Sequence, residues 1–190
     1  MVLPVLKYGH PMLRQKGARI ERVTAEVKAL IEDMIETMHA ARGIGLAAQQ
    51  VGRALQLAVV DVREVTDRPS SLELDGEPAE VASFMPVVLI NPQIKDIGPC
   101  VDGPEGCLSF PEMYADISRA ETIEVAAVNA SGKPVVFRCG GLLARAIQHE
   151  ADHLNGILFI DRMSSTVKRG LKPELETLHA TTKEELVKSR

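Results

Sequence analysis

Aromatic residues, cysteines and long apolar runs are all scarce in this sequence of 190 residues. It has no tryptophan, two tyrosines and four phenylalanines, so its core must be built mainly from aliphatic side chains. Three cysteines are too few, and odd in number, for a disulfide framework, which favours a reducing compartment with free thiols or a metal-bound thiolate. No apolar run is long enough to cross a bilayer. We therefore expect a cytoplasmic protein without membrane contacts.

A surplus of basic charge is also missing. The formal net charge is -4, which argues against a protein whose main ligand is a phosphate backbone, so we expect no direct DNA binding. Residues 1–7 lack the basic stretch, apolar run and cleavage site of a secretory signal. A hydrophobic content of 45% and a charged content of 25% are typical of a globular protein. The length predicts one domain over residues 1–190, in which residues from about 164 to 190 form a less firmly assigned tail.

The most informative stretch that is present is 148–156, which contains a His-Glu-x-x-His motif. On a helix, His149 and His153 lie one turn apart on the same face, so both imidazoles can bind one metal ion. Glu150 lies about 100° further round the helix, where it can reach a water molecule on that metal. Apolar neighbours predict that this helix is buried, and buried histidines and carboxylates need partners. A metal ion with an open coordination position would make a hydrolytic centre.

Apolar periodicity predicts a second long helix, with Thr24 as its N-cap, and several strands. The acidic stretch 64–80 contains proline and glycine, which predicts a solvated, mobile loop. The polar sequence after Asp161 predicts short helical pieces at 173–180 and 182–188 in a mildly basic tail. The helix that Thr24 would cap is expected at 25–41. Two strands are expected at 57–62 and 87–91, the second ended by Pro92, and a hairpin is expected at 122–128 and 134–138.

Two histidines need a further protein ligand to form a catalytic site. The metzincin extension of the motif fails, because Phe159 stands where the next ligand would be. The remaining candidates are His10, His39, His179, the three cysteines and various acidic residues. Cys107 stands out because it lies in the glycine- and proline-rich segment 103–111, which does not resemble a core strand. Its thiol therefore looks positioned for a role such as metal binding. The alternative is a packed thiol that behaves as a small hydrophobe.

The glycine-rich segment 43–52 is the third unusual stretch. It fits a degenerate dinucleotide-binding pattern, but it follows a helix and leads towards a strand, so we reject nucleotide binding. Glycines here would let the backbone approach another group closely, and Gln50 offers an amide that both donates and accepts. A solvated surface turn is the alternative.

Together, three segments resemble the signature motifs of peptide deformylases, in the right order and at suitable separations. They are 43–50, 105–109 and 148–153, and the similarity runs from Val5 to about Ser164. The sequence departs from the usual pattern at Gln49, where proline is common, and at Tyr114, where some members have arginine. The resemblance implies an α+β fold in which antiparallel β-sheets pack around a central helix carrying the HExxH motif. An N-terminal helix and a C-terminal helical segment complete it.

The resemblance also implies the chemistry: removal of the N-formyl group from the N-terminal methionine of newly synthesised polypeptides, with release of formate. Fe(II) is the implied native metal, and Zn(II), Ni(II) or Co(II) could replace it in the purified protein. Glu150 would take and return the proton. The implied metal ligands are Cys107, His149 and His153; the implied donors to the formyl oxygen are Gln50 and the backbone N–H of Leu108; the implied substrate-binding residues are Ile44, Gly45, Leu142 and Ala146.

The implied partners are N-formylmethionyl nascent peptides, with transient ribosome contact through the basic tail. Glu105 and Arg119 could hold the ligand loops or form a surface ion pair, and Arg145 is expected at the exposed rim of its helix. Two other classes of protein stay open. An HExxH metallopeptidase would need a cleft open on both sides of the scissile bond, and a non-catalytic zinc module would use four protein ligands.

Overall fold

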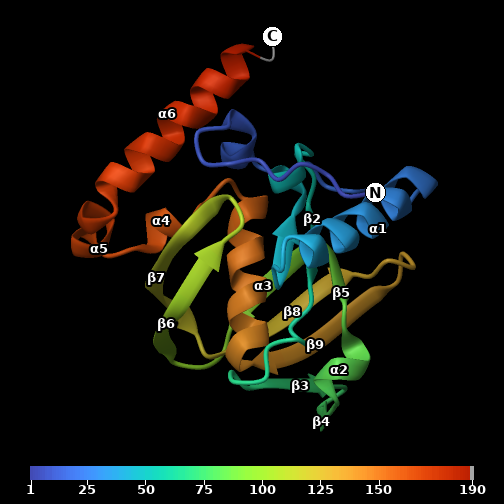
Figure 1. The fold of residues 1–190 in the computed structure, drawn as a ribbon. Coiled ribbons are helices and arrows are strands. Elements are labelled where there is room, and N and C mark those ends of the chain that lie inside the picture. The colour runs from blue at the N-terminus through green and yellow to red at the C-terminus, as the bar shows by residue number, and fades with distance from the viewer. Residues whose placement is uncertain (189–190) are drawn as a thin grey trace.

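The computed structural model describes residues 1–188, which form two antiparallel sheets around one helix. The central helix α3 (Gly141–Leu154) lies between a seven-stranded sheet and a two-stranded sheet (Figure 1). In spatial order, the large sheet contains β1 (Gly45–Ala47), β2 (Leu57–Val60), β5 (Val87–Asp96), β8 (Thr122–Val128), β9 (Pro134–Gly140), β3 (Ser70–Leu74) and β4 (Glu77–Pro78). This arrangement confirms the α+β class expected from the sequence.

Both faces of the large sheet are covered where β2 and β5 pair, which explains why these strands are continuous apolar runs. Side chains alternate between faces along a strand. Leu57 and Val59 pack with α1 (Ala25–Ala40), whereas Val60 packs with α3. The helix predicted at 25–41 is therefore confirmed, with one residue fewer. Thr24 caps it, because its side-chain oxygen accepts a hydrogen bond from the backbone N–H of Val27 at 3.4 Å.

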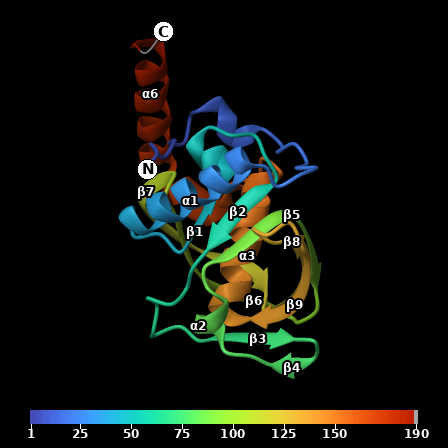
Figure 2. The same cartoon turned by 90° about the vertical axis from the view of Figure 1, so that its right-hand side faces the viewer.

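The small sheet is a hairpin of β6 (Cys100–Cys107) and β7 (Phe110–Ala120) on the other side of α3. Alternate residues of β7 face inward and form a separate core cluster with residues from the C-terminal third. Beyond the hairpin lie α4 (Phe159–Arg162), α5 (Ser165–Gly170) and α6 (Lys172–Lys188). Figure 2 shows α6 projecting from the body, and Leu175 and Thr182 are its buried residues.

Several sequence predictions are corrected by long-range pairing. The 64–80 stretch is only partly a loop, because β3 pairs with β9 and β4 extends that edge of the sheet. Pro92 does not end β5: the strand continues to Asp96 past a register shift between Ile90 and Gln93, a place where proline is tolerated. The two C-terminal pieces form one helix, α6. The hairpin of β8 and β9 is confirmed.

The remaining elements are short. They are the 3-10 helices η1 (Pro11–Arg14) and η2 (Ala48–Val51) and the helix α2 (Val81–Phe84). Over residues 1–188, no helix combines the length and apolar character that spanning a membrane requires.

Candidate metal centre

Three potential ligands converge where the end of β6 meets α3. His149 and His153 lie on one face of α3, with ring centroids 5.1 Å apart. The Cys107 sulfur lies 3.3 Å from Nε2 of His153, and the donor atoms of all three residues lie within 4.8 Å of one another. Both histidines are buried, and Cys107 is half-buried. The structure thus brings together the three residues that the sequence selected, although Cys107 lies more than 40 positions before the two histidines along the chain.

The two histidines differ in their hydrogen-bond partners and in the direction of their pKa shifts. Nδ1 of His149 lies 2.9 Å from Oε2 of Glu105, which leaves Nε2 free to face the thiol. Burial alone would lower the pKa of His149, but its hydrogen bonds to Cys107 and Glu105 raise that pKa well above the ordinary value. Burial holds the pKa of His153 well below its ordinary value, so this imidazole is neutral. The Cys107 sulfur and the Glu105 carboxylate, which flank the ring of His149, are therefore the groups that oppose the effect of its burial.

Glu150 is buried beside the three ligands. Its Oε2 has no hydrogen-bond partner among residues 1–188, and burial raises its pKa to about 7. A Cβ at Gly45 would lie 2.3 Å from Oε1 of Glu150, so glycine is needed for β1 to approach this carboxylate. The close backbone approach expected of the 43–52 segment is therefore observed, and its partner is the carboxylate of the motif.

Gln50 and the turn after β6 complete the polar lining. Oε1 of Gln50 accepts a hydrogen bond from the backbone N–H of Ala47 at 2.8 Å, which fixes the orientation of the amide. Nε2 of Gln50 donates to the Ser109 hydroxyl at 3.1 Å and lies 3.6 Å from the Cys107 sulfur. Leu108 forms the turn itself, and Lys7 donates to its carbonyl at 2.6 Å. The amide donor therefore points to the region of the thiol.

A cavity of about 550 Å³ opens onto this centre. All four predicted substrate-binding residues and both predicted oxygen-binding residues line it, together with Cys107, His149 and Glu150. His153 is absent from the lining and lies deeper in the protein, 1% exposed. Ile44, Leu142 and Ala146 contribute apolar side chains to the lining and belong to one core cluster.

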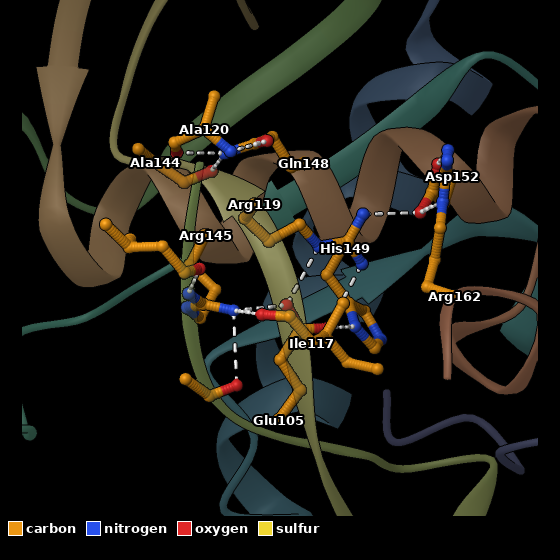
Figure 3. Close-up of polar contacts among 12 residues, drawn as sticks. Glu105, Ile117, Arg119, Ala120, Ala144, Arg145, Gln148, His149, Asp152 and Arg162 are labelled. Atoms are coloured by element: carbon orange, nitrogen blue, oxygen red, sulfur yellow. Dashed lines mark hydrogen bonds and ion pairs between the residues drawn. The ribbon is translucent and has the colours of Figure 1, made fainter. Parts of the chain in front are cut away.

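A buried network behind the ligands is centred on Glu105 (Figure 3). Arg119 donates to both oxygens of Glu105, at 2.8 and 3.0 Å, and also to Asp152 at 2.6 Å. Asp152 in turn pairs with Arg162 at 2.7 Å. Burial would raise the pKa of Glu105, but the hydrogen bonds from His149 and Arg119 outweigh it and lower the pKa to about 2. Glu105 and Arg119 thus form a buried pair that touches a candidate ligand, and the surface-pair alternative is wrong.

The sequence prediction for Arg145 is also wrong. Its side chain is 8% exposed, because the β6–β7 hairpin covers this face of α3. The guanidinium donates to Glu105 at 3.1 Å and to the backbone carbonyls of Ile117, Val101 and Gly103 at 2.6, 2.8 and 3.2 Å. Arg145 therefore attaches the hairpin that carries Cys107 to the helix that carries the histidines.

Gln148 was not singled out from the sequence, although it stands next to the motif. It bonds both backbone groups of Ala120, accepting from N–H at 3.1 Å and donating to C=O at 2.9 Å. The one sequence feature that could have indicated this role is a glutamine directly before the first histidine of a helix expected to be buried. Its partner, Ala120, lies on β7 and could not be identified from the sequence.

The other histidines and cysteines lie away from the centre. His39 pairs with Asp61 at 3.0 Å, and Nδ1 of His10 accepts from the N–H of Met12 at 3.1 Å. Cys100 is exposed, whereas Cys139 is buried and burial raises its pKa to about 12. Within residues 1–188, the candidate metal-binding group consists of Cys107, His149 and His153, which is one ligand fewer than a structural zinc site uses.

The chain is similar to known proteins over nearly its whole length. The family model described as "Polypeptide deformylase" matches residues 2–169. A peptide deformylase of Methylacidiphilum infernorum is 45% identical over 178 residues, covering 94% of this chain and 93% of the relative. One from Opitutus terrae is 42% identical over 188 residues, covering 96% of each. The crystal structure of peptide deformylase 1B from Arabidopsis thaliana superposes with a TM-score of 0.82 at 36% identity, covering 96% of this chain and 93% of the other. The chain therefore belongs to the polypeptide deformylase family.

Proposed function

We propose that this chain is a metal-dependent hydrolase that removes the formyl group from the N-terminal methionine of newly synthesised polypeptides and releases formate. The observation that carries the proposal is the meeting of one thiol and two imidazoles within 4.8 Å, beside a buried carboxylate and at the end of a cavity. Family membership supports the reaction, and the geometry supports the roles of individual residues.

The residues present fit a divalent metal ion. Zinc, for example, binds sulfur at about 2.3 Å and imidazole nitrogen at about 2.0–2.1 Å, so neighbouring ligand atoms around it lie roughly 3.5 Å apart. The separation of 3.3 Å between the Cys107 sulfur and Nε2 of His153 agrees with that spacing. One thiolate and two imidazoles leave a coordination position open, and Glu105 holds the ring of His149 in place. We propose Fe(II) as the native metal, with Zn(II), Ni(II) or Co(II) as replacements.

When bound, the metal would supply Lewis-acid chemistry, polarising the formyl carbonyl and making a water molecule more acidic. The protein would supply the proton transfers. Glu150, whose pKa of about 7 lies near neutrality, can accept a proton from the attacking water and later give it to the departing amine. Its lack of any other partner leaves Oε2 available for that transfer.

The remaining lining residues would orient the substrate. The Gln50 amide and the backbone N–H of Leu108 are the proposed donors to the negative charge that develops on the formyl oxygen. Gln50 is held for this task by its bond to Ala47. Ile44, Leu142 and Ala146 would receive the methionine side chain, and Gly45 would keep the backbone of β1 close to Glu150.

A metallopeptidase is the second candidate, because the His-Glu-x-x-His helix would serve it equally well. The third ligand favours the deformylase: HExxH peptidases of the thermolysin type use a carboxylate, whereas Cys107 offers sulfur here.

We also propose that residues 1–190 act as one catalytic domain in the cytoplasm, where nascent chains are made. The C-terminal segment would contact the ribosome transiently.

The test is a comparison of two peptides. Formyl-Met-Ala-Ser should release formate, measured with a coupled dehydrogenase, and leave the peptide bonds intact by mass spectrometry. An unformylated peptide with several internal bonds should remain uncut. New peptide ends would support the peptidase instead, and release of neither product by the metal-loaded protein would contradict both.

A further inference from the structure

Four cationic side chains line the cavity, and one of them, Arg145, is held by Glu105 and the β6–β7 hairpin. The other three come from separate segments. Lys7 comes from the N-terminal segment, Arg42 from the turn after α1 and Arg68 from the segment before β3. Lys7 is engaged with the Leu108 carbonyl. Arg42 is exposed and Arg68 is half-buried, and neither guanidinium forms a hydrogen bond or ion pair with the residues of the described range 1–188. These two cations are therefore available to a ligand in the cavity.

The acidic residues that line the cavity do not balance these charges. Glu105 pairs with Arg119, Arg145 and His149, and Glu150 is buried beside the candidate metal ligands. Glu112 is exposed and is the one other acidic residue of the lining. The chain as a whole carries a net charge of -4, so the excess of cationic over acidic side chains in the cavity lining is a local feature and does not reflect the general composition.

A bound formyl-methionyl peptide would pass close to both arginines. Arg68 lines the cavity and precedes Pro69, whose carbonyl accepts a hydrogen bond at 2.9 Å from the N–H of Leu142, another lining residue. Arg42 precedes Gly43 and Ile44, which also line the cavity. An extended peptide advances about 3.3 Å per residue, so the second and third residues lie within about 7 Å of the methionine. Arginine side chains can span that distance.

We propose that Arg42 and Arg68 make the enzyme selective for formyl-methionyl peptides with an acidic side chain at the second or third residue. Lysine and arginine at these positions are disfavoured by the same charges. The inference rests on the proposed deformylase function and specifies its substrate class. An exposed ion pair changes an equilibrium by about 2- to 5-fold, so two such contacts give glutamate a preference over lysine of about 10-fold in kcat/KM.

The experiment measures formate release from formyl-Met-Glu-Ala, formyl-Met-Lys-Ala and formyl-Met-Gln-Ala, and from the corresponding set with the variable residue third. All peptides are amidated at the C-terminus so that the variable side chain is their only charge difference. The metal-loaded wild-type protein is compared with Arg42→Glu, Arg68→Glu and the double variant. Arg22→Glu is the matched control, because Arg22 is also exposed but lies outside the cavity lining.

The expected glutamate-to-lysine ratio is about 10 for the wild type and for Arg22→Glu, lower for each single variant, and below 1 for the double variant. Raising the ionic strength from about 0.01 M to about 1 M should bring the wild-type ratio towards 1, because the screening length falls from about 30 Å to about 3 Å. Equal kcat/KM for all peptides, or a ratio unchanged in the double variant, would overturn the selectivity while leaving the deformylase function intact. No formate from any peptide would overturn the function and the selectivity together.

Discussion

Replacing Arg145 by methionine should loosen the attachment of the β6–β7 hairpin to α3. The substitution keeps much of the aliphatic volume but removes four donated hydrogen bonds, to Glu105 and to the carbonyls of Ile117, Val101 and Gly103. Because Cys107 ends β6 and the histidines lie on α3, a looser hairpin should also misplace the thiol relative to the imidazoles. The variant therefore tests both stability and the assembly of the centre.

The magnitude follows from which of these bonds are buried. The acceptors Val101 and Gly103 are partly exposed and can bind water in the variant, so we count only the bonds to Ile117 and Glu105. Hydrogen bonds involving a charged group contribute about 1.5–3 kcal/mol each, so the two bonds together give about 3–6 kcal/mol. For a protein of this size, about 1 kcal/mol corresponds to about 2–4 °C in Tm, so the expected decrease is roughly 6–24 °C.

The assay is thermal unfolding of the apo and metal-loaded proteins, together with titration of metal affinity. Metal affinity should fall about 10-fold or more, as is typical when groups that orient ligands are lost. Arg138→Met is the matched control, since Arg138 is 45% exposed on the side chain and contacts Glu73 and Glu124 only at 3.6 and 3.9 Å. Its cost should stay below about 1 kcal/mol. A decrease in Tm for Arg145→Met no larger than that of the control would refute this account of the attachment.

Three further predictions concern the centre. Glu150→Gln should reduce formate release by about 10²–10⁴-fold while the metal content per chain is unchanged, because the proton acceptor is lost but the ligands are kept; loss of the metal would argue against this assignment. Gly45→Ala should lower kcat by roughly 10²-fold, since the new Cβ would lie 2.3 Å from the Glu150 carboxylate and displace it; an unchanged kcat would show that its position is not critical. The free energy of unfolding of the apo protein should fall as the pH is lowered from about 4.5 to about 2, because the Glu105 pKa drops from 4.5 to about 2 on folding and the unfolded chain takes up the proton first. Urea titrations across that range should show a weaker pH dependence for Glu105→Gln, and equal slopes would exclude Glu105 as the cause.

Local sequence patterns predicted the elements whose determinants are local. The helix of His149 and His153 follows from residue spacing and apolar flanks, and its start follows from the Gly140-Gly141 pair at the end of β9. The same is true of α1, with its Thr24 cap. Cys107 could be selected as a candidate ligand because glycines and prolines surround it in the sequence. Its distance from the histidines in space could not be predicted from their spacing in the sequence.

The errors lie where distant segments decide the environment. Arg145 was expected at the exposed rim of its helix because no residue near it in the sequence indicates that the β6–β7 hairpin covers this face of α3. The acidic 64–80 stretch becomes β3 and β4 because β9 offers a free edge, and an edge strand tolerates charged side chains facing solvent. The β6–β7 hairpin was missed since Gly103 and Pro104 disfavour a strand locally, while pairing with β7 supplies the order.

The most direct test of the metal centre is X-ray absorption spectroscopy of the metal-loaded protein. With zinc, we predict one sulfur neighbour at about 2.3 Å and two imidazole nitrogens at about 2.0–2.1 Å, with one lighter atom completing the shell. Cys107→Ser should remove the sulfur signal. A shell without sulfur in the wild-type protein, or a sulfur signal that survives in Cys107→Ser, would contradict the account.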